Sequence, residues 1–340
     1  MKLKTAFLAL LSLALSAIIC QYKGDAWEEK IRSAYYSTTK DSVPVYIKTI
    51  VDENGVPYVY YAMYNNITAG KQYNPTIVSN YAIDYYNELT KKDDSAVKKK
   101  FLNCIDWLAK NINYKDGYAL YTFNWQHPYY DSIGSNWTSG MTSGRAIEAF
   151  SDAYLLSSSQ KYIDYSMSLL RGYYQPIQSG GFTYKGPDGW WYEEYASINL
   201  HTPKVMNGHV FALQGVQKLW SITKNDSAAF IVQQGVLALK NKLADYSMPN
   251  GWSYYDAYHK VADEKYHTIH TKMMKELFET TKEPVFNEYY KKWNASLTQP
   301  YIYRIVSKKN RSGLILYGLI SAVIFALFLL LLTFIKKRKR

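Results

Sequence analysis

Eight helix-like segments, joined alternately by short and long connections, limit the fold more than any other feature of this chain. Apolar residues recur at spacings of three and four in residues 75–90, 96–112, 142–157, 160–174, 206–222, 226–246, 267–281 and 284–297. Short polar links join these segments in pairs, and long connections at 113–141, 175–205 and 247–266 separate the pairs. In an up-and-down array, all long connections leave the helices at the same end. The sequence therefore predicts four helical hairpins within residues 71–300, with three long connections gathered at one end.

Residues 21–70, before the helices, have a different pattern. The stretch VPVYIKTIVDENGVPYVYYAMY alternates apolar and polar residues around Asn54-Gly55, which is a strong β-hairpin signal. We expect a short region of mixed β and irregular structure here. The complete prediction is an all-α dominated fold of the α/α toroid or barrel type, with about four helical hairpins and a small N-terminal β-hairpin region.

Both ends of the chain are apolar. Residues 1–20 combine Lys2 and Lys4 with the run AFLALLSLALSAIIC, which is typical of a signal peptide that is removed; an uncleaved anchor is the alternative. Residues 313–335 contain no charge and are long enough for a transmembrane helix, which needs about 20 residues. The basic tail KKRKR, residues 336–340, should stay in the cytoplasm. The sequence thus predicts a single-pass membrane protein with its body in the Golgi or another secretory lumen, or at the cell surface.

The net charge of +12 lies largely in these terminal segments and gives no reason to expect nucleic-acid binding. Cys104 lies in a helical pattern and is expected to be buried without a disulfide partner. The sequons at four asparagines agree with an exported glycoprotein: Asn66, Asn136, Asn225 and Asn294.

The three long connections are rich in aromatic residues. They contain YALYTFNWQHPYYDSIGSNWTSG, GGFTYKGPDGWWYEEY and MPNGWSYYDAYHKVADEKYH. Aromatic rings stack on the apolar faces of sugars while polar groups bond the hydroxyls, so a cleft lined in this way suits a carbohydrate chain. The alternative is a helical bundle whose tyrosines only cap one end.

Two adjacent carboxylates in the second connection are candidates for proton transfer. Glu193 and Glu194 follow Trp190, Trp191 and Tyr192. A carboxyl group among these rings should lose hydration and have a raised pKa, which suits a group that exchanges protons. Two solvated glutamates on a surface loop are equally compatible with the local sequence.

The third connection offers phenols and imidazoles. Tyr254 and Tyr255 lie in NGWSYYD, and Tyr266 opens YHTIH. A phenol is a poor base unless its phenolate is stabilised, because its ordinary pKa is about 10. His267 and His270 fall on one helical face, but no third metal ligand accompanies them at a recognised spacing. We expect no metal or other cofactor, and interpret these histidines as structural or as hydrogen-bond partners of a sugar.

Several motifs occur together in a specific order: YNPTIVSNYAIDYYNEL, GMTSGRAIEAFSDAYLL, WYEEY, MNGH, NGWSYYD and YHTIHTKMMKELFETTKEPVFNEYYKKW. With them, residues 70–298 resemble the C-terminal domain of the D-glucuronyl C5-epimerases. These enzymes invert C5 of glucuronate to iduronate within heparan-type polysaccharides. The resemblance implies an α/α barrel of helical hairpins, in agreement with the four predicted from periodicity.

By motif, the resemblance implies that Glu194, Tyr195, Tyr255 and Tyr266 transfer protons, with Asn207 as a neighbouring polar contact. The C5 hydrogen lies beside a carboxylate, so its removal gives a dianionic, enolate-like species. The site must therefore neutralise that carboxylate and place a proton-transfer group on each face of the ring. The other residues predicted to contact substrate are Trp191, Glu193, Lys204, Arg145, Tyr254, His267 and His270.

The chain departs from the family pattern in two places. Ala257 and Tyr258 stand where the family usually has an arginine after YYD, so the substrate carboxylate needs another partner. Lys204, Lys185 and Arg145 are the candidates. The N-terminal β portion of animal members is reduced here to residues 21–70, so the site is either incomplete or completed by a second copy in a homodimer.

The sequence thus predicts a membrane-anchored isomerase that converts D-glucuronate to L-iduronate in a heparan-like acidic polysaccharide. Two alternatives stay open. A uronate polysaccharide lyase begins with the same deprotonation at C5 and then expels the group at C4. A glycan-binding surface protein would keep the cleft without catalysis.

Overall fold

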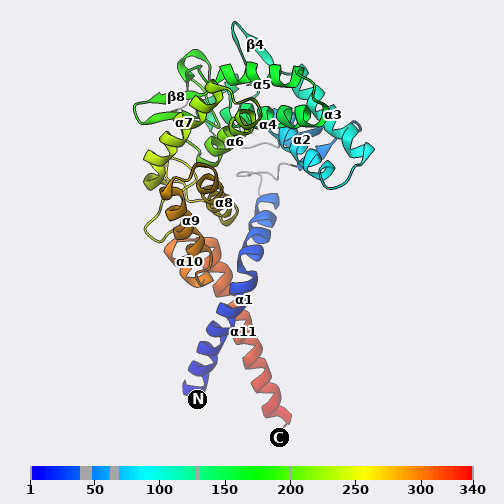
Figure 1. The fold of residues 1–340 in the computed structure, drawn as a ribbon. Helices are drawn as coiled ribbons and strands as arrows, with labels where there is room; N and C mark the ends of the chain where they lie inside the picture. The colour runs from blue at the N-terminus through cyan, green and yellow to red at the C-terminus, as the bar shows by residue number, and fades with distance from the viewer. Residues whose placement is uncertain (1, 39–47, 62–68, 128–129, 200, 339–340) are drawn as a thin grey trace.

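The computed structural model describes residues 2–38, 48–61, 69–127, 130–199 and 201–338. The centre of this described part is an arc of four helical hairpins (Figure 1). The hairpins pair α2 (Pro75–Leu89) with α3 (Ser95–Lys110), α4 (Gly140–Ser157) with α5 (Lys161–Gly172), α6 (Met206–Thr223) with α7 (Asp226–Lys242), and α8 (Glu264–Thr281) with α9 (Pro284–Leu297). The eight helices predicted from periodicity are confirmed, with ends that differ by a few residues.

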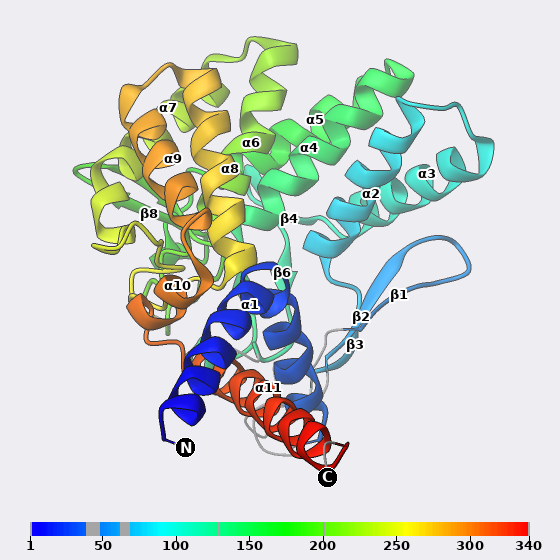
Figure 2. The same ribbon diagram turned by 90° about the horizontal axis from the view of Figure 1, so that it is seen from below.

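The hairpins form two layers. The first helices pack on one another in sequence, α2 on α4, α4 on α6 and α6 on α8, and each second helix packs chiefly behind its own partner (Figure 2). Because α4, α6 and α8 each begin after a long connection, their N-terminal ends lie at the same end of the array. This arrangement positions the candidate site.

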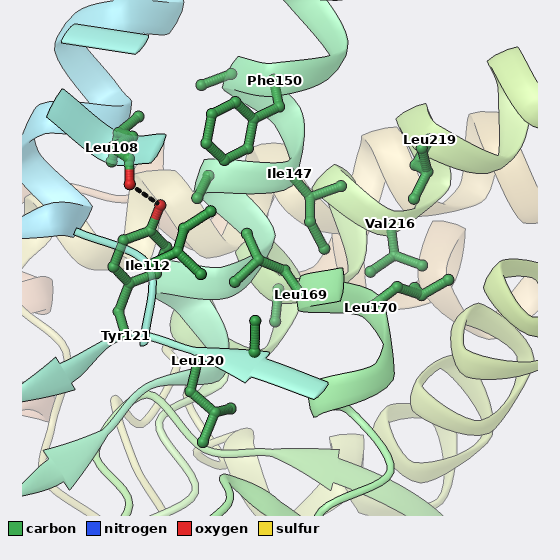
Figure 3. Close-up of a cluster of buried hydrophobic side chains, with 14 of the residues drawn as sticks. Leu108, Ile112, Leu120, Tyr121, Ile147, Phe150, Leu169, Leu170, Val216 and Leu219 are labelled. Carbon is green, nitrogen blue, oxygen red and sulfur yellow. Dashed lines mark hydrogen bonds between the residues drawn. The ribbon is translucent and has the colours of Figure 1, made fainter. Parts of the chain in front are cut away.

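The core lies between these layers. Figure 3 shows Leu108, Phe150, Leu169 and Val216 among the buried side chains that fill it. The Tyr121 hydroxyl enters the same core and donates to the Leu108 carbonyl at 3.0 Å, so its polar end is satisfied.

Short antiparallel strands occupy the connections. β1 (Lys48–Val51) pairs with β2 (Pro57–Tyr61), which pairs with β3 (Gly70–Gln72), so the predicted hairpin at Asn54-Gly55 is confirmed. In the long connections, β4 (Asn113–Lys115) pairs with β5 (Tyr118–Leu120), β6 (Thr122–Phe123) with β7 (Trp137–Thr138), and β8 (Thr183–Gly186) with β9 (Gly189–Tyr192). The described residues also form short 3₁₀ helices, namely η1 (Asp131–Ile133), η2 (Ile177–Ser179) and η3 (Leu243–Tyr246).

The N-terminal segment differs from its prediction. α1 runs without a break from Lys2 to Thr38, so residues 21–38 are helical instead of belonging to a mixed region over 21–70. This stretch contains no proline, and three of its polar side chains bond to C-terminal segments. Whether residues 1–20 are removed stays a prediction.

The C-terminal segments complete the fold. α10 (Tyr301–Ser307) and α11 (Arg311–Arg338) follow α9, and α11 packs along α1 (Figure 1). Among the described residues, the segments Thr5–Ile31 and Arg311–Ile335 are long and apolar enough to cross a membrane.

Candidate active site

The three long connections meet at the N-terminal ends of the inner helices. Thr138 and Ala196 exchange two backbone hydrogen bonds of 2.9 Å, which join the first connection to the second. The first residue of α6 donates its N–H to the Tyr255 carbonyl at 3.2 Å, which joins the second to the third. The Tyr130 hydroxyl donates to Asp256 Oδ2 at 3.3 Å, which joins the first to the third. The expectation that these connections gather at one end is confirmed.

Glu194 lies two residues after β9 and packs against the first turn of α6. A Cβ on Gly208 would lie 2.4 Å from Glu194 Oε2, so glycine leaves room for the carboxyl group. Glu194 is 8% exposed, and within the described part of the chain its Oε2 has no hydrogen-bond partner. Burial raises the pKa of Glu194 to about 7. The neighbouring Asn207 is also buried, and its Oδ1 likewise lacks a partner among the described residues.

Three tyrosines lie in series beside Glu194 and are here called the tyrosine chain (Tyr195, Tyr255 and Tyr266). Tyr195 is next to the Glu194 carboxyl group, Tyr255 is next to Tyr195, and Tyr266 is next to Tyr255. The rings of Tyr255 and Tyr266 lie edge to face with centroids 4.8 Å apart. Burial, aided by the charge of Glu194, raises the pKa of Tyr266 to about 12 and those of Tyr195 and Tyr255 well above the usual range. The four proton-transfer candidates therefore form one cluster.

Glu193 lies deeper than Glu194 and is held by the backbone. The Lys204 N–H donates to Glu193 Oε2 at 3.0 Å, and burial raises the pKa of Glu193 to about 8. Lys204 has a φ of 48°, a left-handed conformation that is uncommon outside glycine. Its ammonium lies 4.2 Å from the centroid of the Tyr184 ring. Lys204 thus contacts Glu193 through its backbone.

An aromatic wall (His127, Tyr130 and Trp137) surrounds Tyr195. The three ring centroids lie 4.4, 5.4 and 5.8 Å from that of Tyr195. Burial lowers the pKa of His127 to about 3, so this imidazole is neutral. The aromatic composition of the first connection indicated such a surface, but motif reading did not single out these three rings.

Two lysines that sequence reasoning also missed lie beside the tyrosine chain. Lys260 Nζ is 5.6 Å from the centroid of Tyr255, and Lys265 Nζ is 5.9 Å from that of Tyr266. Both lysines are exposed. They place positive charge next to the phenols without removing it from water.

Other predicted cations are engaged elsewhere. Arg145 bonds to Asn80 Oδ1 at 2.7 Å and to Glu148 Oε2 at 2.6 Å. Lys185 Nζ lies over the Trp190 ring, 4.5 Å from its centroid. Neither has a described contact with the tyrosine chain.

Four aromatic side chains predicted to bind substrate pack against protein. Trp191 is 2% exposed and its ring stacks on those of two core residues. His267 and His270 are fully buried, with their Nδ1 atoms 2.8 and 2.9 Å from the Ser253 hydroxyl, and burial lowers the pKa of both to about 3. The Tyr254 ring stacks on an imidazole 4.7 Å away. Burial contradicts a substrate contact for Trp191, His267 and His270, because local sequence does not reveal which face of β9 or α8 the core covers. For the half-buried Tyr254 the contact stays a prediction.

Comparison with known proteins identifies relatives. The family described as "D-glucuronyl C5-epimerase C-terminus" matches residues 113–295. An uncharacterised protein of Methanocaldococcus jannaschii is 27% identical over 188 residues, which cover 54% of this chain and 58% of that protein. The D-glucuronyl C5-epimerase of Caenorhabditis elegans is 25% identical over 245 residues, which cover 62% of this chain and 38% of that protein. The chain thus spans less than two thirds of either relative.

A solved structure supports the fold. The cellobiose 2-epimerase of Bacillus thermoamylovorans superposes with a TM-score of 0.55 over 84% of this chain and 73% of its own, at 10% identity. This likeness concerns the α/α-toroid type of architecture alone. The family match covers more than half of the chain and contains all four members of the cluster of Glu194 and the tyrosine chain. The chain therefore belongs to the D-glucuronyl C5-epimerase family, through the C-terminal domain of that family.

Proposed function

We propose that the protein is an epimerase that inverts C5 of hexuronate residues, converting D-glucuronate to L-iduronate in a heparan-like acidic glycan. The observation that carries the proposal is the cluster that brings Glu194, whose pKa is raised to about 7, together with Tyr266, whose pKa is raised to about 12. The carboxyl group of this cluster supplies a base near neutral pH, and the tyrosine supplies a phenolic acid. Family membership supports the same chemistry.

The reaction needs a proton taken from one face of the sugar and returned to the other. The Glu194 carboxylate takes the C5 hydrogen as a proton, and the C–H electron pair moves into the bond between C5 and the carboxylate carbon to give an enediolate. The Tyr266 hydroxyl then gives its proton to the opposite face of C5. Starting from iduronate, the same two groups act in the reverse order.

One turnover changes the protonation states of Glu194 and Tyr266, and the tyrosine chain restores them. Glu194 is then protonated and Tyr266 is a phenolate. Tyr195 and Tyr255 lie between them, and their hydroxyls relay a proton from Glu194 back to Tyr266. This relay explains why three tyrosines accompany one carboxylate.

The remaining requirements are binding and charge neutralisation. Within the aromatic wall, the half-buried Tyr130 offers a ring for stacking against a sugar, whereas His127 and Trp137 are 4% and 3% exposed and pack against Tyr195. Lys260 and Lys265 replace the missing arginine as partners of the substrate carboxylate, because their ammonium groups lie next to the tyrosine chain. Lys260→Met should therefore raise KM for a hexuronate oligosaccharide several-fold, whereas Lys115→Met on the distant β4 should leave it unchanged.

Proton NMR of hexuronate oligosaccharides in deuterated water tests the proposal with the full chain. The expected result is deuterium uptake at C5 together with new iduronate signals. Tyr266→Phe should lose inversion while still binding the sugar, and Tyr114→Phe, an exposed tyrosine on β4, serves as the matched control. Ultraviolet absorbance of an unsaturated uronate would instead indicate a lyase. Binding without exchange in the unaltered protein would indicate a glycan-binding protein.

A further inference from the structure

α1 and α11 together form a helical pair, here called the stem, that projects from the arc of hairpins (Figure 1). The two helices contact each other through small or polar groups: Ser12, Ser16 and Cys20 are buried, and the Tyr317 hydroxyl donates to the Leu13 carbonyl at 3.0 Å. Their outer faces are apolar and exposed, with Phe7, Leu10, Leu319, Val323 and Leu330 each more than half exposed. Such faces suit lipid.

Both free ends of the stem point the same way. The helices cross and diverge, and the N-terminus and the C-terminus both lie at the end of the stem away from the arc (Figure 1). The first carries Lys2 and Lys4, and the second carries KKRKR. A two-helix membrane hairpin leaves both ends on one side, and the positive-inside rule makes that side the cytoplasm for each of them.

The opposite end of the stem is bonded to the body. Arg304 of α10 is 4% exposed and bonds to Asp25 of α1 at 2.6 Å and to Glu264 of α8 at 2.7 Å. Asn310 Nδ2 donates to both carboxylate oxygens of Glu28, at 2.9 and 3.0 Å. α1 is therefore an integral part of the folded chain, held by side chains that would otherwise remain buried and unpaired.

No long linker separates the stem from the site. α9 ends at Leu297, α10 occupies Tyr301–Ser307, and α11 begins at Arg311. Lys308 Nζ lies 3.7 Å from the centroid of the Trp252 ring, which packs in the third connection. Short connections and this contact therefore join the stem to the third connection, which carries Tyr255 and Tyr266.

The site lies close to the level where the stem would leave the bilayer. The apolar run of α1 ends at Cys20, and Asp25 follows five residues later, about 7 to 8 Å along the helix. A headgroup layer is about 5 to 8 Å thick. Asp25 and Arg304 thus fall at headgroup level, and Glu264, which Arg304 also binds, is two residues from Tyr266.

α10 has the composition of a helix at a membrane surface. Tyr303 and Val306 are 51% and 57% exposed, and Lys308, Lys309 and Arg311 follow at once. Exposed aromatic and basic residues in this order are typical of the interface between lipid and water.

We propose that α1 is retained, that α1 and α11 cross the membrane as a pair, and that they hold the site at the bilayer surface, so that its substrate is a hexuronate on a membrane-attached glycan. The chemistry of this substrate rests on the proposed function, whereas the position of the site does not. A glycan that extends freely into solution would present few hexuronates at this height. A lipid-linked glycan presents all of its first sugars there.

The position is tested without activity. In the full chain reconstituted in vesicles, a fluorophore on Lys265→Cys, next to Tyr266, should be quenched by lipids with nitroxide headgroups. The same fluorophore on Lys115→Cys should not, because β4 lies on the side of the arc away from the stem (Figure 1). The native Cys20 and Cys104 are buried and leave the introduced thiol as the labelled group. Equal quenching at both sites, or an intact mass that lacks residues 1–20, would overturn the proposal.

The substrate is tested by offering one hexuronate oligosaccharide in two forms, soluble and coupled to a lipid in the same vesicles. Deuterium uptake at C5 should be at least about tenfold faster for the lipid-linked form, because a shared surface raises the effective concentration. Equal rates would overturn the substrate inference while leaving the epimerase intact. Quenching at Lys265→Cys with no uptake on either form would overturn the proposed function and the substrate with it, but not the position.

Discussion

A carboxylic acid is a far stronger acid than a phenol, so a proton moves favourably from a carboxyl group to a phenolate. Here burial raises the pKa of Glu194 to about 7, while the phenols of the tyrosine chain stay protonated until one of them gives its proton to a carbanion. The sequence predicted these four residues from motif order and predicted the raised carboxyl pKa from neighbouring aromatics. It did not predict the aromatic wall or Lys260, because their contacts arise only when three distant connections meet.

Activity should depend on pH through Glu194. Its carboxylate is the base, so the rate of C5 exchange from glucuronate should rise with pH up to about 7 and then level off. Glu194→Gln should abolish this exchange, and Glu279→Gln, an exposed residue late in α8, should not change it. Initial rates by NMR across this range provide the measurement. A flat profile would assign the base to another group.

The free energy of unfolding should also depend on pH through Glu194, and the sign of this dependence is defined. The pKa of Glu194 is about 7 in the folded protein and 4.5 by its ordinary value, so between these pH values the folded chain holds a proton that the unfolded chain has released. Its contribution to the free energy of unfolding therefore falls as pH rises from about 4.5 to about 7. Glu193 adds a similar contribution up to about pH 8. Thermal unfolding of Glu194→Gln should fall less steeply over the lower range than that of the unaltered protein.

The Glu194 carboxyl group has room because residue 208 is a glycine and carries no Cβ. Gly208→Ala would place a Cβ 2.4 Å from both Cβ and Oε2 of Glu194, which forces the carboxyl group away from the tyrosine chain. The rate of C5 exchange should fall by about tenfold to a hundredfold, because small misplacements of a catalytic group have effects of this size. Gly318→Ala, where nothing lies within 4 Å of the added atom, is the control. An unchanged rate of C5 exchange in Gly208→Ala would mean that Glu194 takes no part in the proton transfer.

At the scale of elements, the spacing of α4 and α6 determines how the inner layer packs. A Cβ on Gly215 would lie 1.8 Å from the Gly144 carbonyl oxygen, so these backbones are in direct contact. Gly215→Ala should lower the free energy of unfolding by about 3 kcal/mol or more, because the two helices must separate. Ser221→Ala, on the exposed side of the same helix, should change it by less than about 0.5 kcal/mol. Chemical denaturation of both variants checks the difference.

The predictability of elements follows their length. The eight long helices were predicted because each repeats its apolar spacing over several turns, as in α6 and α8. β6 and β7 have two residues each, too few to show alternation, and their pairing depends on contacts between connections. The helix over residues 21–38 was missed because its polar residues face α10 and α11 rather than an apolar core.

At the scale of the whole molecule, Arg304 links the stem, α10 and the first turn of α8. Arg304→Gln would leave Asp25 and Glu264 without their cation, and the free energy of unfolding should fall by about 2 kcal/mol. This is less than for a fully buried pair, because the two carboxylates are about a third exposed. The midpoint of thermal unfolding of the full chain in detergent checks this, with the exposed Arg171→Gln as the control. An unchanged midpoint would mean that the stem and the body are not coupled.

The bond between Asp25 and Arg304 can form only late in translation, because it joins residues 279 positions apart. At about 5 to 20 residues per second, the ribosome delivers Arg304 some 15 to 60 s after Asp25. Throughout that interval α1 lacks the contacts with α10 and α11, and Asp25 has no cation to pair with. The coupling of α1 to α8 therefore waits for α10, and a nascent chain halted ahead of Arg304 would leave Asp25 and Glu264 without their cation.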